Sequence, residues 1–463
     1  FRLSLSVGRR AICRYLTVTM ARQSGLAFLL AAVAIQAGAL RHSSRASHGG
    51  ASLMSLDQLR KYSFHDFVVE YSRKYREGSE EYRLREGAFD EHKREILEFR
   101  QGPERSWQMG VNGFMDFTQA EKRTMLGYTG GRSRKPSDGA VALKRDRNTQ
   151  APLPADFTVQ RPKAKLIEIV RDQGSCGSCW AQAAVSTLEG QLEVAPGVME
   201  ALEARRSPNA SLAAVPQNVT LPTVPSLSGQ TIVSCTPNPR NCGGTGGCGG
   251  ATVELAYDMI RENGGLPFAV DWPYESGSGA TPQCKKDLFA RSMISIDGYT
   301  VLPSNKLNPL KQALVTTGGP VAVSVDASRW FLYWSGIYRD ARSTASEGEF
   351  TVNHAVTLMG YSDPKPEQEQ RGFWKIKNCP LVRQHSGWWI PTLGVHAGLP
   401  EGLVADAGHR RLRVTSSRRM AATASTTSQV NWKIKNSWGD MWGELGYIRI
   451  EMKADEENHC GWD

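Results

Sequence analysis

Hydrophobic residues recur every three or four positions between residues 57 and 100, and charged residues fill the positions between them. This spacing predicts amphipathic helical structure, because side chains three and four residues apart share one face of a helix. Residues 110–116 then break the periodicity. Residues 130–150 are polar and basic and contain glycine and proline, which predicts a linker that a protease can cut.

The pattern changes at about residue 151, where short hydrophobic runs stand among glycine, tryptophan and cysteine. The runs at residues 321–325, 354–359 and 446–450 predict β-strands, and residues 183–188 predict a helix. A chain of 463 residues has room for two or three domains.

The five-residue sequence Trp-Lys-Ile-Lys-Asn occurs twice, at residues 374–378 and 432–436. The residues between the two copies have neither clean helical nor strand periodicity. A structural repeat would share more than five residues. We therefore interpret residues 379–431 as foreign to the folded domain, from a retained intron or a duplicated exon edge. A true domain insertion is the alternative.

The first forty residues predict a secretory signal. Residue 1 is Phe, and we expect residues 1–19 to be untranslated or foreign. A short basic lead after Met20 is followed by an apolar run at residues 25–39, so residues 20–40 predict a signal peptide. A buried helix or a membrane anchor is the alternative. Sequons at Asn209 and Asn218 fit a secretory route.

The formal net charge of +10 invites a nucleic-acid or membrane-surface interpretation. The charge is unevenly placed, however. Residues 1–19 hold four arginines and no acid, and residues 379–431 hold six arginines against two acids. Most of the positive charge thus lies in the two segments that we interpret as foreign. We therefore expect neither a nucleic-acid partner nor a stable membrane anchor.

The chain has nine cysteines, five of them between residues 176 and 248. In an oxidising compartment this pattern suggests disulfides and one free reactive thiol. Cys179 suits that thiol, because it lies between a glycine-rich loop and the predicted helix. The helix dipole and a nearby imidazolium would lower its pKa and favour the nucleophilic thiolate. The side chain of Gln173, on the same loop, would join the backbone N–H of Cys179 in an oxyanion hole.

Two cysteines at the spacing of Cys176 and Cys179 also occur in redox sites and as half of a zinc site. A zinc site needs a second pair of ligands at similar spacing, and none follows in the sequence. A redox motif usually has an aromatic residue before its first cysteine, whereas Trp180 follows the second. We therefore expect no metal and no organic cofactor.

Residues 172–181 resemble the Cys-Gly-Ser-Cys-Trp signature of the papain and cathepsin family of cysteine proteases. Six further segments follow in the order of that family, at residues 227–235, 247–250, 272–274, 319–321, 352–356 and 436–448. Other residues resemble the ERFNIN and GNFD patterns of the family's inhibitory propeptide. The ERFNIN-like residues are Glu81, Arg85, Phe89 and Ile96, with His92 and Arg100 in place of two asparagines, and the GNFD-like residues are Gly110, Asn112, Phe114 and Asp116.

The resemblance implies an α+β, papain-like fold of two halves. The Cys179 helix leads the helical half, the β-barrel half carries His354, and a helical propeptide covers the cleft between them. Cys179 would be the nucleophile, His354 its acid–base partner, Asn436 the residue that orients His354, and Gln173 an oxyanion donor. Asn436 is preferred to Asn378 because only Asn436 continues into Ser-Trp-Gly.

The resemblance also implies residues that bind substrate and residues that pair as disulfides. The implied substrate-binding residues are Gly250, Ala251, Asn353, Trp438 and Trp442, and Trp438 would also shield the His354–Asn436 hydrogen bond. The implied disulfides are Cys176–Cys248 and Cys235–Cys284, which leaves Cys242 and Cys460 unassigned. Two further positions depart from the family: Gln182 stands where an aromatic residue usually follows Trp-Ala, and Ala251 replaces a glycine.

We therefore predict a cysteine endopeptidase that cuts protein or peptide substrates through a thiolate acyl-enzyme. The predicted organisation is a propeptide at 57–120, a linker at 121–150 and a peptidase domain at 151–463. The chain is expected to be a monomer of the secretory pathway, lysosomal, vacuolar or extracellular, and its own propeptide is expected to inhibit it. The alternatives are an inactive papain-fold binding protein and a non-functional product of mis-splicing.

Overall fold

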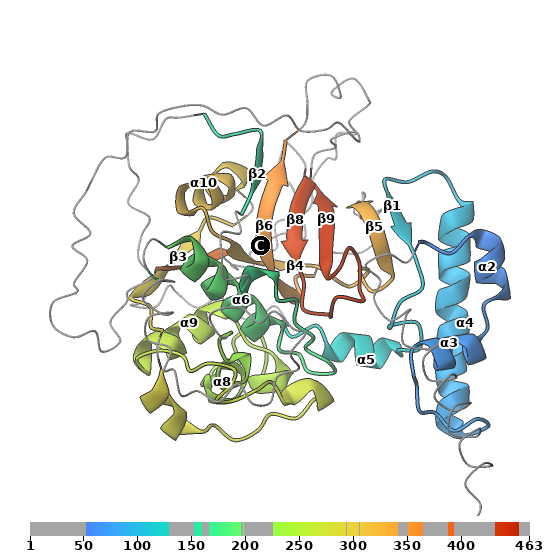
Figure 1. Ribbon diagram of the computed structural model, residues 1–463, viewed down its shortest axis with the longest axis horizontal. Coiled ribbons are helices and arrows are strands. Elements are labelled where there is room, and N and C mark those ends of the chain that lie inside the picture. Colours follow the sequence, from blue (N-terminus) through green and yellow to red (C-terminus); the bar gives the residue numbers. More distant parts are fainter. Residues whose placement is uncertain are drawn as a thin grey trace, which may run out of the picture. The chain divides into compact units, whose positions relative to one another are not determined.

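The computed structural model describes residues 52–128, 152–159, 166–195, 198, 226–292, 294–304, 306–340, 351–363, 388–392 and 431–452. The predicted signal peptide, most of the linker, both sequons, Asn378 and Cys460 lie outside the described residues. Within them, a helical N-terminal part (52–128) precedes a part in which helices pack against a β-sheet (Figure 1).

The N-terminal part contains four helices where a single helical stretch was expected over most of its length. Ser63 and Ser79 divide the stretch, because each accepts a hydrogen bond from a backbone N–H of the helix that follows it. Gly78, with a φ of 76°, makes the turn before the longest helix. The helices are α2 (Leu56–Lys61), α3 (Phe64–Glu70), α4 (Glu80–Gln101) and α5 (Gln119–Thr124).

Aromatic side chains hold these helices together. The rings of Phe64 and Phe67 on α3 lie 5.5 Å and 5.4 Å from the ring of Phe89 on α4, and the ring of Tyr62 lies 6.0 Å from it. Phe67 and Phe89 are fully buried. Each such side chain contributes roughly 1.5–3 kcal/mol of hydrophobic stabilisation. The hydrophobic spacing in the sequence therefore marks real packing faces, although the helices are shorter than expected.

The described residues form one nine-stranded sheet in the order β1-β5-β9-β8-β6-β4-β7-β3, with β2 paired to β6. The predicted strands at residues 321–325, 354–359 and 446–450 are confirmed as β4, β6 and β9. The strands are β1 (Trp107–Met109), β2 (Asp156–Thr158), β3 (Gly298–Leu302), β4 (Val321–Val325), β5 (Tyr333–Tyr338), β6 (His354–Ser362), β7 (Trp388–Thr392), β8 (Asn431–Lys435) and β9 (Tyr447–Glu451).

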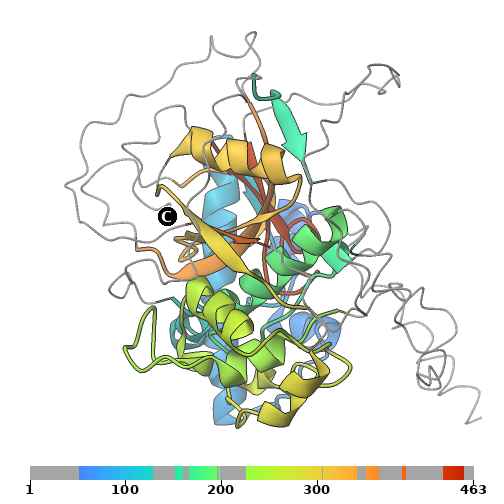
Figure 2. The same cartoon turned by 90° about the vertical axis from the view of Figure 1, so that its left-hand side faces the viewer.

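The helical half lies against one side of this sheet, and its central helix is α6 (Cys179–Val194). This helix contacts β6 and β4 on one side and α8 and α9 on the other (Figures 1 and 2). It is almost wholly buried, and its buried Glu189 pairs with Arg171 at 2.6 Å. The helical half also contains α8 (Gly229–Cys235) and α9 (Val253–Glu262), whereas α10 (Leu307–Thr317) packs against β6.

The segment that we interpreted as foreign contributes one strand. Its residues 388–392 form β7, which pairs with β3 along five residues and meets β4 at one. A strand thus forms within residues 379–431 although their sequence shows no clean strand periodicity. Tryptophan, isoleucine and threonine favour extended backbone, and β3 offers an edge to pair with. Of the two Trp-Lys-Ile-Lys-Asn copies, the second lies in the sheet as β8, between β6 and β9.

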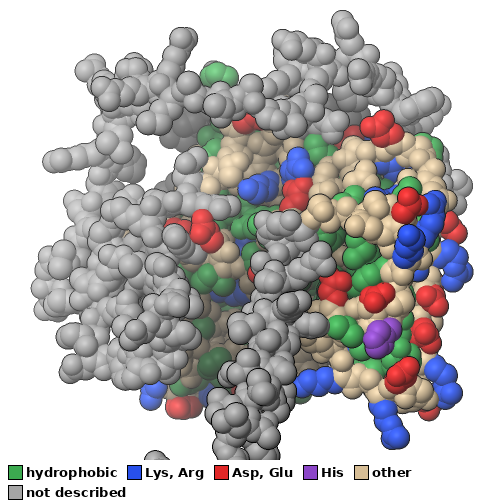
Figure 3. All heavy atoms as spheres, turned by 45° about the vertical axis from the view of Figure 1, so that its right-hand side comes forward, with side chains coloured by type: hydrophobic (Ala, Val, Ile, Leu, Met, Phe, Trp, Pro, Cys, Tyr) green, Lys and Arg blue, Asp and Glu red, His purple; other side chains and the backbone are tan. Residues whose placement is uncertain are grey.

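Acidic and basic side chains are mixed on the face that includes the N-terminal helices (Figure 3). No continuous basic patch stands out among the described residues of this face. None of the described helices is long and apolar enough to cross a membrane.

Candidate active site

Cys179 is the first residue of α6, as the sequence predicted. The loop before it turns at Gly174, whose φ is 58°, and is tied to the glycine-rich loop of Cys248 by the Cys176–Cys248 disulfide. Ser178 occupies the N-cap position, but its side chain makes no capping hydrogen bond. The Cys179 thiol is free and fully buried at the positive end of the helix.

His354 begins β6 and Asn436 directly follows β8, the neighbouring strand, so sheet pairing brings the two side chains together. His354 Nε2 lies 2.7 Å from Asn436 Oδ1, and this oxygen also accepts the backbone N–H of Ser437. Because the amide oxygen can only accept, Nε2 carries the proton. Nδ1 is buried and has no hydrogen-bond partner among the described residues.

Trp438 covers the His354–Asn436 pair. Its ring centroid lies 5.0 Å from that of His354, and it stacks on Phe331 at 4.3 Å. Trp438 is 3% exposed and Asn436 is also 3% exposed, so water has little access to the hydrogen bond between them. A hydrogen bond shielded in this way holds the imidazole ring in one orientation.

The backbone N–H of Ala355, the residue after His354, lowers the pKa of the Cys179 thiol, which indicates that the thiol lies near the start of β6. Burial raises the pKa of the Cys179 thiol to about 11, against the smaller effect of the N–H groups of Ala355 and Gly127. Burial likewise lowers the pKa of His354 to about 4, and the bond to Asn436 opposes this. Burial therefore favours the neutral forms of both groups while the site is covered, and the thiolate stays a prediction.

Three hydrogen bonds hold the side chain of Gln173. Its Nε2 donates to the carbonyl oxygens of Cys176 and Met125, both at 2.7 Å. Its Oε1 accepts the Ser437 hydroxyl at 2.6 Å. The amide is therefore held at both ends, and one of its N–H groups already binds a carbonyl from the N-terminal part of the chain.

Residues 125–128, which follow α5, occupy the site. Besides the Met125 carbonyl on Gln173, the N–H of Tyr128 donates to the Asn353 carbonyl at 3.1 Å. Gly127 lies so close to Gly177 that a Cβ atom built on it would come within 1.8 Å of the Gly177 carbonyl oxygen. A side chain at residue 127 therefore cannot be accommodated without moving the backbone.

The predicted substrate-binding residues fall into two groups. Gly250 and Asn353 contact residues 125–128, since a Cβ on Gly250 would lie 2.5 Å from the Gly127 carbonyl oxygen. Ala251 is completely buried in the core of the helical half, and Trp442 is 1% exposed and donates to the Trp330 carbonyl behind Trp438. Both side chains are thus buried while residues 125–128 occupy the site, and their role in binding substrate stays a prediction.

The N-terminal part also adds a strand to the sheet. β1 pairs with β5 in antiparallel register, with Trp107 opposite Gly336. Beyond it, Asn112 Nδ2 donates to the Phe331 carbonyl at 2.8 Å, and the ring of Phe114 meets Trp438 edge to face at 5.6 Å. The GNFD-like residues thus dock on the tryptophan that covers His354.

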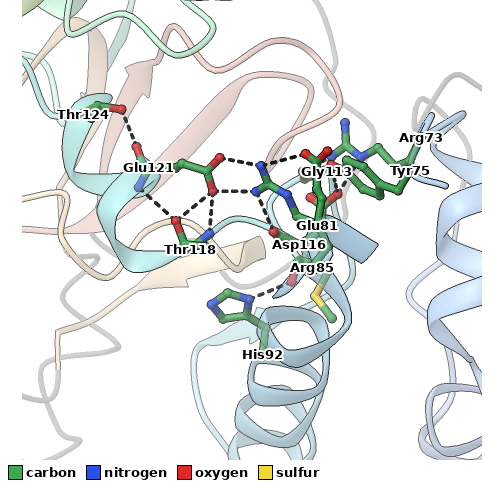
Figure 4. A network of polar contacts seen from close by, with 11 residues as sticks. Arg73, Tyr75, Glu81, Arg85, His92, Gly113, Asp116, Thr118, Glu121 and Thr124 are labelled. Carbon is green, nitrogen blue, oxygen red and sulfur yellow. Dashed lines mark hydrogen bonds and ion pairs between the residues drawn. The ribbon is translucent and has the colours of Figure 1, made fainter. Parts of the chain in front are cut away.

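A polar network fixes the approach of α5 to the site (Figure 4). Arg73 and Tyr75 both bind the buried carboxylate of Asp116. Arg85 on α4 donates to the Asp116 carbonyl and makes two bonds of 2.6 and 2.7 Å to Glu121, which completes the capping box of α5 with Thr118. The ERFNIN-like arginine therefore connects the GNFD-like loop to the helix that leads into residues 125–128.

Both implied disulfides, Cys176–Cys248 and Cys235–Cys284, are present. Cys242 is a second free, buried thiol. Nowhere in the described ranges do three His, Cys, Asp or Glu side chains gather in a way that could hold a metal ion.

Three groups at the site were missed from the sequence. Ser437, next to Asn436, holds Gln173. Residues 125–128 fill the site. The capping sequence Thr118-x-x-Glu121 just before them predicts a helix start, and so indicates that ordered structure continues past residue 120. The hydroxyl of Tyr274 binds the Gln173 carbonyl at 2.8 Å, and nothing in the sequence pointed to that contact.

Comparison with known families gives two matches. Residues 153–203, 210–379 and 419–463 match the model of the papain family cysteine protease, and residues 64–121 match that of the cathepsin propeptide inhibitor domain. The chain therefore belongs to the papain family of cysteine proteases, and its N-terminal helices form an inhibitor-type propeptide.

Curated relatives include cathepsin S of Mus musculus, 28% identical over 77% of this chain and 74% of the relative, and a cathepsin L-like protein of Caenorhabditis elegans, 27% identical over 77% and 75%. Cysteine protease 1 of Oryza sativa is 27% identical, and the match spans 52% of its length. Among solved structures, digestive procathepsin L2 from Tenebrio molitor larval midgut is 25% identical, with a TM-score of 0.55 over 86% of this chain and 96% of that one.

Proposed function

We propose that the chain is the zymogen of a cysteine endopeptidase that hydrolyses peptide bonds through a thioester acyl-enzyme. The observation that carries this proposal is the orientation of His354. Asn436 binds its Nε2–H and leaves Nδ1 without a partner among the described residues, while Cys179 lies alongside at a helix N-terminus. A nucleophile beside a base that a third group orients is the arrangement that acyl transfer needs.

In the proposed reaction, water enters when the propeptide leaves, and the proton of the Cys179 thiol moves to His354 Nδ1. The thiolate attacks the substrate carbonyl carbon. The resulting oxyanion accepts hydrogen bonds from the Gln173 Nε2–H, which the propeptide now occupies, and from the backbone N–H of Cys179. His354 returns its proton to the leaving amine, and a thioester remains. Water then attacks the thioester with His354 as base, which releases the carboxylic acid and the thiol.

The propeptide is proposed to inhibit this site directly. It takes the Gln173 donor and the Asn353 acceptor, packs backbone against Gly177 and Gly250, and keeps the Cys179–His354 pair in its neutral form. Two disulfides among the described residues support folding in an oxidising compartment. We propose a secretory route to a lysosome, a vacuole or the exterior, with proteins or peptides as substrates.

The test is labelling of the acid-processed chain with a thiol-directed epoxide. Label is expected at Cys179, and Cys179→Ala is expected to abolish peptidase activity. Cys242→Ala is the matched control, because it removes the other free thiol of the described residues and should keep activity. Label at Cys242 in place of Cys179, or activity in Cys179→Ala, would refute the proposal.

A further inference from the structure

The two donors of the proposed oxyanion hole belong to different pieces of backbone. Gln173 lies on the loop before the active-site helix, and Cys179 begins the helix itself. Ser437 fixes the far end of the Gln173 amide through Oε1, but it does not fix the distance between the Gln173 backbone and the start of α6. Catalysis by paired donors depends on that distance, because donors act only when they lie about 2.7–3.1 Å from the developing oxyanion.

The hydroxyl of Tyr274 joins these two pieces. It lies 2.8 Å from the Gln173 carbonyl oxygen and 2.8 Å from the Ser178 hydroxyl, next to Cys179 in the chain. A carbonyl can only accept, so the Tyr274 proton goes to Gln173 and the Ser178 hydroxyl donates to Tyr274. The Ser178 side chain does not make the capping hydrogen bond that an N-cap serine usually makes, which typically contributes about 1 kcal/mol to helix stability. Its hydroxyl instead bonds to the Tyr274 hydroxyl.

Tyr274 is itself rigidly held. The N–H groups of the next two residues, Glu275 and Ser276, both donate to Gln230 Oε1 on α8, at 2.8 and 3.0 Å. Trp272, two residues before it, is 1% exposed, and its carbonyl accepts the Ser228 hydroxyl. Residues outside the Gln173 loop and α6 therefore fix the position of Tyr274, whose hydroxyl joins these two segments.

Gln182 adds a feature particular to this chain. It lies one turn after Ser178 on α6, where the family usually has an aromatic residue, and its buried Nε2 has no hydrogen-bond partner among the described residues. Burial raises the pKa of Tyr274 to about 12, and the side chains of Ser178 and Gln182 oppose that rise. The hydrogen bond from Ser178 polarises the Tyr274 hydroxyl and strengthens the bond that it donates to Gln173.

We propose that Tyr274 is a positioning residue of the oxyanion hole, which sets the spacing of its two donors by joining the Gln173 carbonyl to Ser178. The proposal rests on the oxyanion hole of the proposed function. Tyr274 touches no reacting atom and acts through Gln173 and the start of α6.

The test uses the full chain after acid processing and the variant Tyr274→Phe, which removes only the hydroxyl. Loss of one neutral hydrogen bond predicts a fall in kcat of about three- to tenfold at unchanged KM. Gln173→Ala should lose about 10²–10³-fold. Because Tyr274 acts through Gln173, adding Tyr274→Phe to Gln173→Ala should lower kcat less than about twofold further. Tyr257→Phe is the matched control, since it removes a buried hydroxyl elsewhere in the same half.

Alkylation by iodoacetamide separates positioning from general damage. This reaction needs the Cys179 thiolate but forms no oxyanion, so Tyr274→Phe should be alkylated at the parent rate while it hydrolyses peptides more slowly. Three results would overturn the proposal. Tyr274→Phe could slow alkylation as much as peptide hydrolysis, it could lower kcat as much in the Gln173→Ala background as in the parent chain, or it could leave kcat unchanged. If Tyr274→Phe fails to fold, Ser178→Ala breaks the same link and must show the same split.

The two proposals fail differently. A Gln173→Ala variant with the parent kcat would remove the oxyanion role of Gln173, and the role of Tyr274 with it. A slow Gln173→Ala beside an unaffected Tyr274→Phe would overturn only the inference about Tyr274.

Discussion

The propeptide should lose its hold as pH falls through the range in which His92 titrates. His92 lies on α4, 1% exposed, at a position where the propeptide pattern has asparagine. Its Nδ1 lies 2.8 Å from the Met115 carbonyl oxygen and therefore donates (Figure 4). Its Nε2 lies 2.6 Å from Lys122 Nζ and can only accept. Protonation of His92 would leave two donors facing each other.

The surrounding charges set the direction of this effect. Burial lowers the pKa of His92, Lys122 on α5 lowers it further, and the Met115 carbonyl, Glu91 and Asp116 oppose the shift. Burial also lowers the pKa of Lys122 to about 8, although Glu95 and Glu91 raise it. Arg329 of the peptidase part acts on Glu95. These effects together favour a neutral His92 in the docked propeptide.

The sign follows from the lowered pKa. Above the ordinary value of 6.5, His92 is neutral whether the propeptide is folded on the enzyme or unfolded, so it costs nothing. Below 6.5 the unfolded propeptide binds a proton that the folded, docked form excludes, because the groups that lower the pKa of His92 lie within the propeptide itself. Docking is then weakened by up to about 1.4 kcal/mol, or tenfold, for each pH unit until the docked pKa is reached. Since Lys122 lies on the helix before Met125, this loss falls on the segment that fills the site.

The variant His92→Asn should therefore process more slowly at pH 5 than the parent chain and depend less on pH between 6.5 and 5. Autoprocessing rates measure the first effect. Hydrogen exchange of the α4 and α5 amides, in a Cys179→Ala background that cannot process itself, measures docking directly. His65→Asn is the control, because His65 is exposed. A His92→Asn chain with the parent pH profile in both assays would refute the reasoning.

Three further predictions concern other parts of the chain. Asn436→Ala should lower kcat about 10–100-fold, because it removes a hydrogen bond to the charged imidazolium. Asn378→Ala, in the first Trp-Lys-Ile-Lys-Asn copy, should leave kcat unchanged. Equal losses of kcat in the two variants would mean that either copy can enter the sheet. Gly127→Ala should weaken propeptide docking, seen as faster processing at pH 6.5, because a Cβ there meets the Gly177 carbonyl; an unchanged rate would show that the backbone moves aside freely. Deleting residues 379–436 joins Asn378 directly to Ser437, so that the first Trp-Lys-Ile-Lys-Asn copy replaces the second, and should raise soluble yield and activity; a dead deletion would show that the deleted segment, which includes β7, is needed.

Local patterns in the sequence predicted much of the fold. The strands that became β4, β6 and β9 and the start of α6 were visible because each is a short hydrophobic run or a helix signal. The division of residues 57–100 was also visible in principle, since Ser63 and Asp66 form a capping box. The hydrophobic period continues across that boundary, so only the capping box marks it.

Contacts between distant segments could not be predicted in the same way. Cys179 and His354 were paired by family resemblance, since no local pattern places a helix start beside a strand start far along the chain. The contact between Tyr274 and Gln173 depends on how two irregular loops pack, and loop packing has no period to detect. β7 was missed because five residues of extended backbone give too short a pattern inside a segment that looked foreign.

The strand that the propeptide adds has a consequence for the enzyme after its removal. β1 covers the outer side of β5, and the inner side of β5 meets β9 at only two residue pairs. Once the propeptide leaves, the backbone of β5 becomes an open sheet edge, the kind of surface through which proteins pair with one another and aggregate. Two features limit the exposure, since Gly336 has a φ of 95° and gives its N–H to Glu444, which bends this edge away from a flat template. The propeptide thus also covers a sheet edge. Its removal would open the active site and, at the same time, expose an edge through which the enzyme could aggregate.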